Sequence, residues 1–153
     1  MLILLVFILL FFNLDCAISQ SHTDSIRAGI NNLPDNPKKA GLYIDLVFSF
    51  RGSKIDSMEY YIGLAEKIIE RQMDSNVLAR IYNAKGNLYR YYEKEDKALE
   101  FYLKSLEVNR KINNKKEQIN NLGNIGQIYL ITQDYSSALE NAREVLRLSN
   151  DLI

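Results

Sequence analysis

The side chains that most often carry chemistry are scarce in this sequence. His22 is the only histidine and Cys16 is the only cysteine. A catalytic triad or a metal cluster needs several such groups together, so one histidine without partners supports neither. Serine, aspartate and glutamate are plentiful, but no local spacing pairs them with a base. We therefore predict no enzymatic activity, no cofactor and no metal, and keep a hydrolase or metal protein with an unusual site as a distant alternative.

Charge gives no indication of nucleic-acid binding. The 153 residues include 19 Lys and Arg and 19 Asp and Glu, whereas a phosphate backbone is bound by a predominantly basic face. Arg110-Lys111 and Lys115-Lys116 could form a local basic corner, with Lys104 one or two helical turns earlier. We interpret this basic corner as a solvated helix end, where cations complement the helix dipole. We expect no nucleic-acid partner.

The N-terminus indicates export. Leu2 to Phe12 are all apolar, and a helix of this length would rise only about 16 Å, about half of a hydrocarbon core. Ala17 and Ser19 place small residues where a signal peptidase requires them, which predicts a signal peptide over residues 1–19 and a mature N-terminus at Gln20. The alternative is an anchor in the inner membrane formed by residues 2–14. A lipoprotein signal is disfavoured because Asp15 precedes Cys16.

The rest of the chain repeats itself. Gly86, Tyr89, Ala98, Leu99, Glu100 and Leu106 recur 40 residues later as Gly126, Tyr129, Ala138, Leu139, Glu140 and Leu146. Small residues within helical patterns allow a partner helix to approach closely, and large residues such as Tyr102 fill the remaining space. Polar breaks at residues 93–96 and 133–134 divide each unit into two helices, and Asp74-Ser75-Asn76 can cap a helix that begins near Val77. The pattern predicts an all-α stack of helical hairpins.

These small and aromatic positions resemble the tetratricopeptide repeat, whose usual length is about 34 residues. The resemblance rests on Gly86, Tyr89, Ala98, Tyr102 and Leu106, and on Gly126, Tyr129 and Ala138. It implies a right-handed α-solenoid of about three hairpins, which we place at 38–72, 79–113 and 119–152 within a repeat region of 38–153. Residues 20–37 form a lead-in with a short helix over Asp24–Leu33. Lys85 and Ala142 depart from the family pattern.

The segment Leu33-Pro34-Asp35, followed by 40-residue repeats after a signal peptide, resembles the periplasmic repeat region of certain bacterial signalling proteins. In those proteins a transmembrane helix and a histidine kinase or DNA-binding domain follow the repeats. No kinase motif is present in this sequence. The resemblance therefore implies a sensing or scaffolding role in the cell envelope, and it does not imply kinase activity.

The resemblance also implies where a partner binds, because the first helices of tetratricopeptide units line a concave groove. The residues at groove positions are Arg80, Asn83, Asn87, Arg90 and Tyr91 in the second unit, and Asn120, Gly123, Gln127, Leu130 and Ile131 in the third. Arginine and asparagine can bind peptide backbone or carboxylate groups. Asn83 and Asn87 are similar to the asparagines of carboxylate-clamp members, but the matching lysines are absent.

The last helix raises a second question of partners. The last helix is apolar because it contains Leu146 and Leu148 and is followed by Leu152 and Ile153. A repeat array exposes an apolar, association-prone surface at its end unless a polar helix caps it. Self-association, docking of a second protein and a longer parent chain are three competing explanations. We favour the last.

Together these observations predict a non-enzymatic scaffold in the bacterial cell envelope, periplasmic after export, that binds a protein or peptide in its groove. The alternative is the sensory region of a signal-transduction protein, of histidine kinase or transcription-regulator type, whose output domain is missing or separate. Contact with a membrane is expected only if the N-terminal segment is not cleaved.

Overall fold

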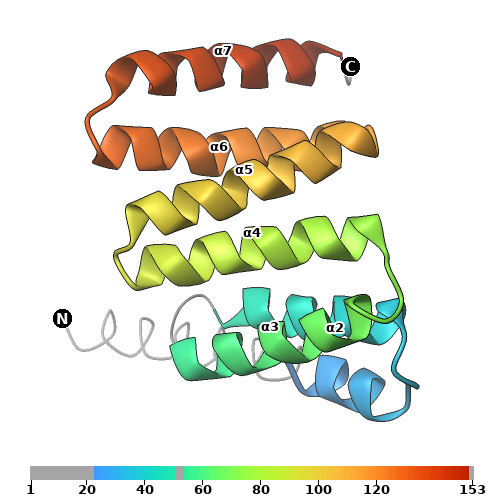
Figure 1. The fold of residues 1–153 in the computed structure, drawn as a ribbon. Helices are drawn as coiled ribbons and strands as arrows, with labels where there is room; N and C mark the ends of the chain where they lie inside the picture. The colour runs from blue at the N-terminus through green and yellow to red at the C-terminus, as the bar shows by residue number, and fades with distance from the viewer. Residues whose placement is uncertain (1–22, 51–53, 152–153) are drawn as a thin grey trace, which may run out of the picture.

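The computed structural model describes residues 23–50 and 54–151, and it is helical throughout its regular elements. Six labelled helices form three hairpins that stack in chain order (Figure 1). The helices are α2 (Pro37–Ser49), α3 (Ile55–Ile69), α4 (Ser75–Tyr91), α5 (Glu95–Lys111), α6 (Lys115–Ile131) and α7 (Tyr135–Asn150). The predicted all-α solenoid of three hairpins is therefore confirmed. The predicted signal peptide lies outside the described residues.

The lead-in also contributes helix. Residues 23–31 are helical, and Ile26 and Ile30 from this segment belong to the same buried cluster as α2, α3 and α4. None of the described helices is both long enough and apolar enough to cross a membrane.

A shared turn sets the 40-residue period. Helices α4, α5 and α6 each have 17 residues, and a three-residue turn follows each of them. In every turn the middle residue has a left-handed backbone, with φ of 54° at Glu93, 55° at Asn113 and 62° at Gln133. The amide of the next residue reaches back to a carbonyl in the last helical turn, for example from Lys94 to Tyr89 at 3.0 Å. This is the Schellman arrangement, recurring every 20 residues.

Side-chain caps fix where the helices begin. Asp74, Asn114 and Asp134 each accept a hydrogen bond from the backbone amide three residues further on. These caps supply a partner for an amide that the helix itself leaves unpaired. The second and third hairpins consequently start at residues 75 and 115, each four residues before the unit boundary that we place by sequence.

The buried residues form two apolar clusters with a polar layer at the junction of the second and third hairpins. One cluster spans residues 26–88 and the other spans α5, α6 and α7. Ser105 of α5 donates to the Ala79 carbonyl of α4 at 2.7 Å, and between α5 and α6 the Asn109 amide donates to Oδ1 of Asn121 at 2.8 Å. All three polar side chains are buried. The network favours one alignment of the two hairpins, because a slip would break these buried hydrogen bonds, although Nδ2 of Asn121 is itself buried without a hydrogen-bond partner among the described residues.

The repeat-signature residues pack differently in the two hairpins that carry them. In the second hairpin the fully buried Tyr102 ring lies against Gly86, while Tyr89 stacks on Phe101 with ring centres 5.3 Å apart. Ala98 and Leu106 are also buried there. In the third hairpin Ala142 replaces the large tyrosine. Gly126, Tyr129 and Ala138 are correspondingly only half-buried.

Candidate binding groove

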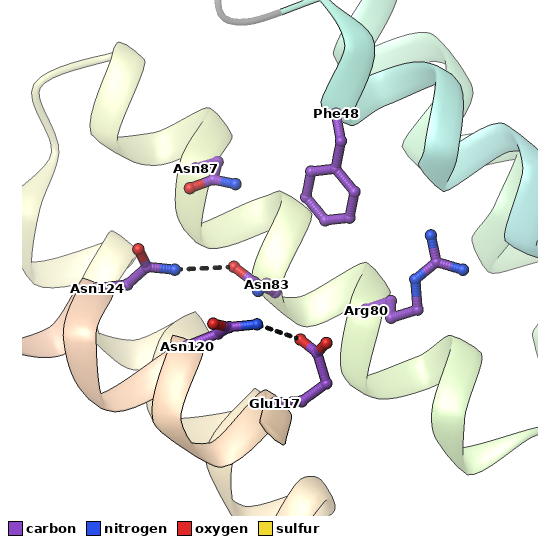
Figure 2. Close-up of a pocket in the computed structure, with 7 residues that line it drawn as sticks. All are labelled: Phe48, Arg80, Asn83, Asn87, Glu117, Asn120 and Asn124. Carbon is purple, nitrogen blue, oxygen red and sulfur yellow. Dashed lines mark hydrogen bonds between the residues drawn. The ribbon is translucent and has the colours of Figure 1, made fainter. Parts of the chain in front are cut away.

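The first helices of the three hairpins border one polar groove of about 460 Å³. Figure 2 shows its side chains converging from α2, α4 and α6. Seven residues line it: Phe48, Arg80, Asn83, Asn87, Glu117, Asn120 and Asn124. Four of the seven are asparagines, so the groove offers carboxamide donors and acceptors in preference to charged or apolar groups.

A common spacing places these side chains on matching helix faces. Arg80, Asn83 and Asn87 follow one another on α4 at intervals of three and four residues. Glu117 and Asn120, with Asn124 after them, do the same on α6. Intervals of three and four residues keep side chains on one side of an α-helix. Each helix thus presents a charged residue followed by two asparagines to the space between them.

Three hydrogen bonds hold the carboxamides in fixed orientations. The Asn124 amide donates to Oδ1 of Asn83 at 3.2 Å, and the Asn120 amide donates to a carboxylate oxygen of Glu117 at 3.2 Å. The Tyr102 hydroxyl donates to Oδ1 of Asn87 at 2.7 Å. Burial raises the pKa of this tyrosine, which keeps the hydroxyl protonated and able to donate. The repeat core therefore orients one of the groove asparagines.

These bonds leave a defined set of groups for a ligand. With their oxygens occupied, Asn83 and Asn87 keep their amide hydrogens available as donors. Asn120 and Asn124 have each used one amide hydrogen, and they keep the other hydrogen and their carbonyl oxygens. The groove therefore offers hydrogen-bond donors on α4 and both donors and acceptors on α6, and each edge of an extended peptide backbone likewise carries both kinds of group.

Of the two charged residues that line the groove, Arg80 is compensated by an ion pair and Glu117 is not. Arg80 forms an ion pair with Asp45 and lies over the Phe48 ring, at 6.0 Å from its centre. Both side chains of this ion pair are partly exposed to solvent. Glu117 has no ion-pair partner within 4.0 Å among the described residues, and its only side-chain contact of this kind is with Asn120. The groove thus carries no free cation that would favour an anionic ligand.

The structure brings together some of the predicted groove residues and separates others. Arg80, Asn83, Asn87 and Asn120 line the groove, whereas Arg90, Tyr91 and Gln127 do not. Gln127 follows Asn120 by seven residues and so lies about 10 Å further along the helix. Arg90 instead stacks on Tyr91, which packs against the first apolar cluster. Gly123, Leu130 and Ile131 are exposed and also lie outside the groove lining.

Sequence reasoning missed Phe48, Glu117 and Asn124. The repeat was aligned at 40 residues, but the groove spacing of α4 recurs on α6 after 37 residues, from Arg80 to Glu117. A difference of three residues is close to one helical turn, so the same face is kept while the position along the axis moves by about 4.5 Å. A search for a charged residue followed by two asparagines at the same intervals would have found both sets.

The sequence profile of the tetratricopeptide repeat matches residues 77–151, which covers α5, α6 and α7 and most of α4. Residues 77–151 are therefore tetratricopeptide repeats. No curated protein matches the chain significantly in sequence.

Two solved structures share the arrangement of these tetratricopeptide repeats. One is a Signal Transduction ATPase with Numerous Domains (STAND) protein with a tetratricopeptide repeat sensor, from Pyrococcus horikoshii. It is 20% identical, with a TM-score of 0.78, and the alignment covers 92% of this chain and 22% of that protein. The other is BtubC from P. vanneervenii, at 19% identity and a TM-score of 0.72, covering 89% of this chain and 58% of BtubC. At these identities the likeness shows a common fold.

The basic corner of the tetratricopeptide region is mostly neutralised. Arg110 pairs with Glu144 at 2.9 Å, Lys111 with Glu107 at 2.6 Å, and Lys115 with Asp151 at 3.3 Å. Glu107 lies on the same helix as Lys111, whereas Glu144 and Asp151 belong to α7 and its C-terminal end, so two of the three pairs join separate helices. Within the described residues no cluster of His, Cys, Asp and Glu could hold a metal ion.

Proposed function

We propose that this chain is a non-enzymatic interaction scaffold that holds an extended, largely uncharged polypeptide segment in its asparagine-lined groove. Tetratricopeptide repeats are generally protein-interaction scaffolds. The observation that carries the more specific proposal is the set of oriented asparagine side chains that face one groove from α4 and α6. An extended segment between them can accept hydrogen bonds from Asn83 and Asn87 along one edge, and can bond to the oxygens and remaining amide hydrogens of Asn120 and Asn124 along the other.

The charges argue for an internal segment of the partner over its C-terminal carboxylate. Arg80 is paired with Asp45, so it is already neutralised. Glu117 would repel a terminal carboxylate or a phosphate in the same groove. Phe48, which is 38% exposed, offers an apolar contact to one ligand side chain. Specificity would then come from the backbone and one apolar side chain.

A pair of substitutions tests the proposed contacts. Asn83→Ala removes a donor, and Asn87→Asp removes a donor but keeps the oxygen that Tyr102 requires. The probe is a fluorescent peptide selected by the wild-type chain from a displayed library of linear peptides, with binding followed by fluorescence polarisation. Two lost hydrogen bonds of about 1 kcal/mol each predict weakening of about tenfold or more.

The matched control is Gln127→Ala, which removes an exposed carboxamide from α6 outside the groove. It should leave affinity unchanged within experimental error. Equal affinity in the groove variants and the wild type would contradict the proposal, as would a requirement for a free C-terminal carboxylate on the peptide. Circular dichroism of each variant checks that the helices are retained.

Residues 1–19 support export as a second part of the proposal. The chain would then act in the periplasm or cell envelope, with an anchor over residues 2–14 as the alternative. Mass spectrometry of protein recovered from cell fractions tests this. A mature N-terminus at Gln20 in the periplasmic fraction is expected, and an intact Met1 in the cytoplasm would refute export.

The fold favours one further candidate function, the sensory region of a signal-transduction system. The supporting observation is the likeness to a STAND protein that carries a tetratricopeptide repeat sensor. In this case the groove would hold a ligand whose occupancy changes the activity of a kinase or transcription regulator. Proximity labelling in cells distinguishes the two, because labelling of an output protein only in strains with an intact groove supports sensing. Labelling that is independent of Asn83 and Asn87 argues against it.

A further inference from the structure

Glu117 carries the one uncompensated charge among the described residues that line the groove. Arg80, the other charged lining residue, is paired with Asp45, so these two charges cancel. No described lysine or arginine forms an ion pair with the Glu117 carboxylate within 4.0 Å. Lys115, two residues before it, is paired with Asp151 at 3.3 Å. The groove therefore keeps one net negative charge.

The start of α6 does not use the Glu117 side chain. Asn114 caps this helix and Glu117 follows it by three residues, which is the spacing of a capping box. In that motif the glutamate would accept a hydrogen bond from the Asn114 backbone amide. This amide instead donates to the Asn109 carbonyl at 2.9 Å. Figure 2 shows the Glu117 carboxylate in the groove beside Asn120, where a ligand can reach it.

Hydrogen-bond acceptors surround this carboxylate on the α6 side of the groove. The Asn120 amide donates to one carboxylate oxygen at 3.2 Å, and the other oxygen has no hydrogen-bond partner among the described residues. Because the amide group is planar, the same bond keeps the Asn120 carbonyl oxygen close to the carboxylate. Asn124 adds a second carbonyl oxygen one helical turn further along. An ammonium or guanidinium group donates several hydrogen bonds and accepts none, so it matches these acceptors.

We propose that Glu117 selects a Lys or Arg side chain in the bound segment, so that the groove prefers peptides with one cation and one apolar residue. The preference rests on the proposed function, because it concerns the same groove and adds the chemistry of the ligand side chains. Glu117 is half-buried, so a cation paired with it is partly shielded from solvent. Phe48 belongs to α2 and Glu117 to α6, so the apolar residue and the cation lie on opposite sides of α4.

Peptide selection tests this preference. A displayed library of linear peptides is selected on the full chain, which is kept in a mild non-ionic detergent because of the apolar run Leu2–Phe12. The wild type is compared with Glu117→Gln, which removes the charge but keeps an oxygen for the Asn120 amide. We expect the wild type to enrich Lys and Arg at one position, and Glu117→Gln to lose this enrichment. Glu117→Lys should enrich Asp and Glu at the same position.

Affinities for the selected peptide isolate the ion pair. Glu117→Gln should weaken binding about fivefold or more in fluorescence polarisation, and a peptide with glutamine in place of the cation should lose a similar factor on the wild type. The two changes together should weaken binding no more than either alone, because they remove the same contact.

Glu95→Gln is the matched control. Glu95 is also a half-buried glutamate in the first turn of a helix, and it has no ion-pair partner within 4.0 Å among the described residues. It lies outside the groove lining, so its substitution should leave the affinity unchanged.

The outcomes separate this preference from the function on which it rests. If Asn83→Ala and Asn87→Asp weaken binding while Glu117→Gln does not, the groove holds the peptide and the role of Glu117 is overturned. Selection without enrichment of a cation, additive losses in the double change, or equal weakening by Glu95→Gln would overturn it as well. If neither the asparagine variants nor Glu117→Gln changes the affinity, the peptide binds elsewhere, and the proposed function fails together with the preference.

Discussion

Gly86 and Gly126 occupy equivalent positions in α4 and α6, but an alanine is expected to have opposite effects at the two sites. A Cβ at residue 86 would lie 2.5 Å from both Cδ1 and Cε1 of Tyr102. The Tyr102 ring is fully buried, and its hydroxyl is bonded to Asn87. The ring therefore cannot turn aside, and α5 itself would have to move. At Gly126 the nearest atom to a new Cβ would be Cβ of Asn141 at 3.9 Å, which is ordinary contact.

The magnitudes follow from two opposing contributions. Alanine favours a helix interior over glycine by about 0.5–1 kcal/mol. Overpacking of a filled core costs about 1–3 kcal/mol. Gly86→Ala should thus lower the free energy of unfolding by about 1–2 kcal/mol, whereas Gly126→Ala should raise it by about 0.5–1 kcal/mol. Equilibrium urea unfolding, followed by far-ultraviolet circular dichroism, measures both.

A double substitution isolates the steric cause. In a Tyr102→Ala background the ring is gone, and Gly86→Ala should become stabilising, like Gly126→Ala. Stabilisation by Gly86→Ala in the wild type would refute the reasoning, because it would mean that Tyr102 yields without cost. Gly86→Ala in the wild-type chain should also weaken peptide binding, because displacement of the Tyr102 ring releases the Asn87 side chain that the Tyr102 hydroxyl orients.

Two other features give further predictions. Gln133→Gly should raise the free energy of unfolding by about 0.5–1 kcal/mol, because φ is 62° there; Asn113→Gly, at 55°, should give a smaller gain because asparagine tolerates this backbone. Thermal melts of both variants provide the comparison, and equal gains would contradict it. Hydrogen bonds from Ser137 and Ser136 lower the pKa of the Asp134 carboxyl in the folded protein. The ionised carboxylate therefore stabilises the fold fully at a pH above the unfolded carboxyl pKa of about 3.9, and this contribution is lost as the pH falls through the lower folded pKa. Asp134→Asn keeps a capping oxygen and should remove this part of the acid sensitivity in unfolding measured against pH; an unchanged acid profile would refute the assignment.

The helices and their order could be predicted from sequence because small and large residues recur in matching positions. Gly86 facing Tyr102 is a contact between residues 16 apart, and a hairpin of two amphipathic helices is the simplest way to make it. The cap at Asp74 was also visible as a polar break before an apolar pattern. The polar breaks at residues 93–96 and 133–134 overlap two of the turns, but the left-handed backbone within the turns was not indicated by the sequence, because glutamate, asparagine and glutamine occupy that position in place of glycine. The three turns share no residue type at the left-handed position, so their 20-residue spacing cannot be recognised from a recurring glycine.

The groove was only partly predictable for a different reason. Its residues are contributed by three hairpins, so their alignment depends on how the hairpins pack, which local spacing does not determine. The repeat of 40 residues describes the helices, while the groove asparagines follow a spacing of 37 residues. Arg90 and Gln127 satisfy the helical period, yet neither lines the groove: Arg90 contacts Tyr91 and Tyr102 instead, and Gln127 is exposed beyond Asn124. Periodicity predicted the face, and only the structure places the groove along it.

The difference between α5 and α7 shows what specifies a junction between hairpins. At the junction within the chain, Ser105 and Asn109 of α5 meet Asn121 of α6 in a buried hydrogen-bonded layer. On α7 the equivalent positions are Val145 and Ser149, so the polar layer is replaced by an apolar side chain and a hydroxyl satisfied within its own helix. A polar layer selects one specific neighbour, since a wrong partner leaves buried donors unpaired. The face of α7 lacks that requirement. Equivalent positions of the repeat thus form a polar junction that specifies the fold on α5 and a surface without such specificity on α7.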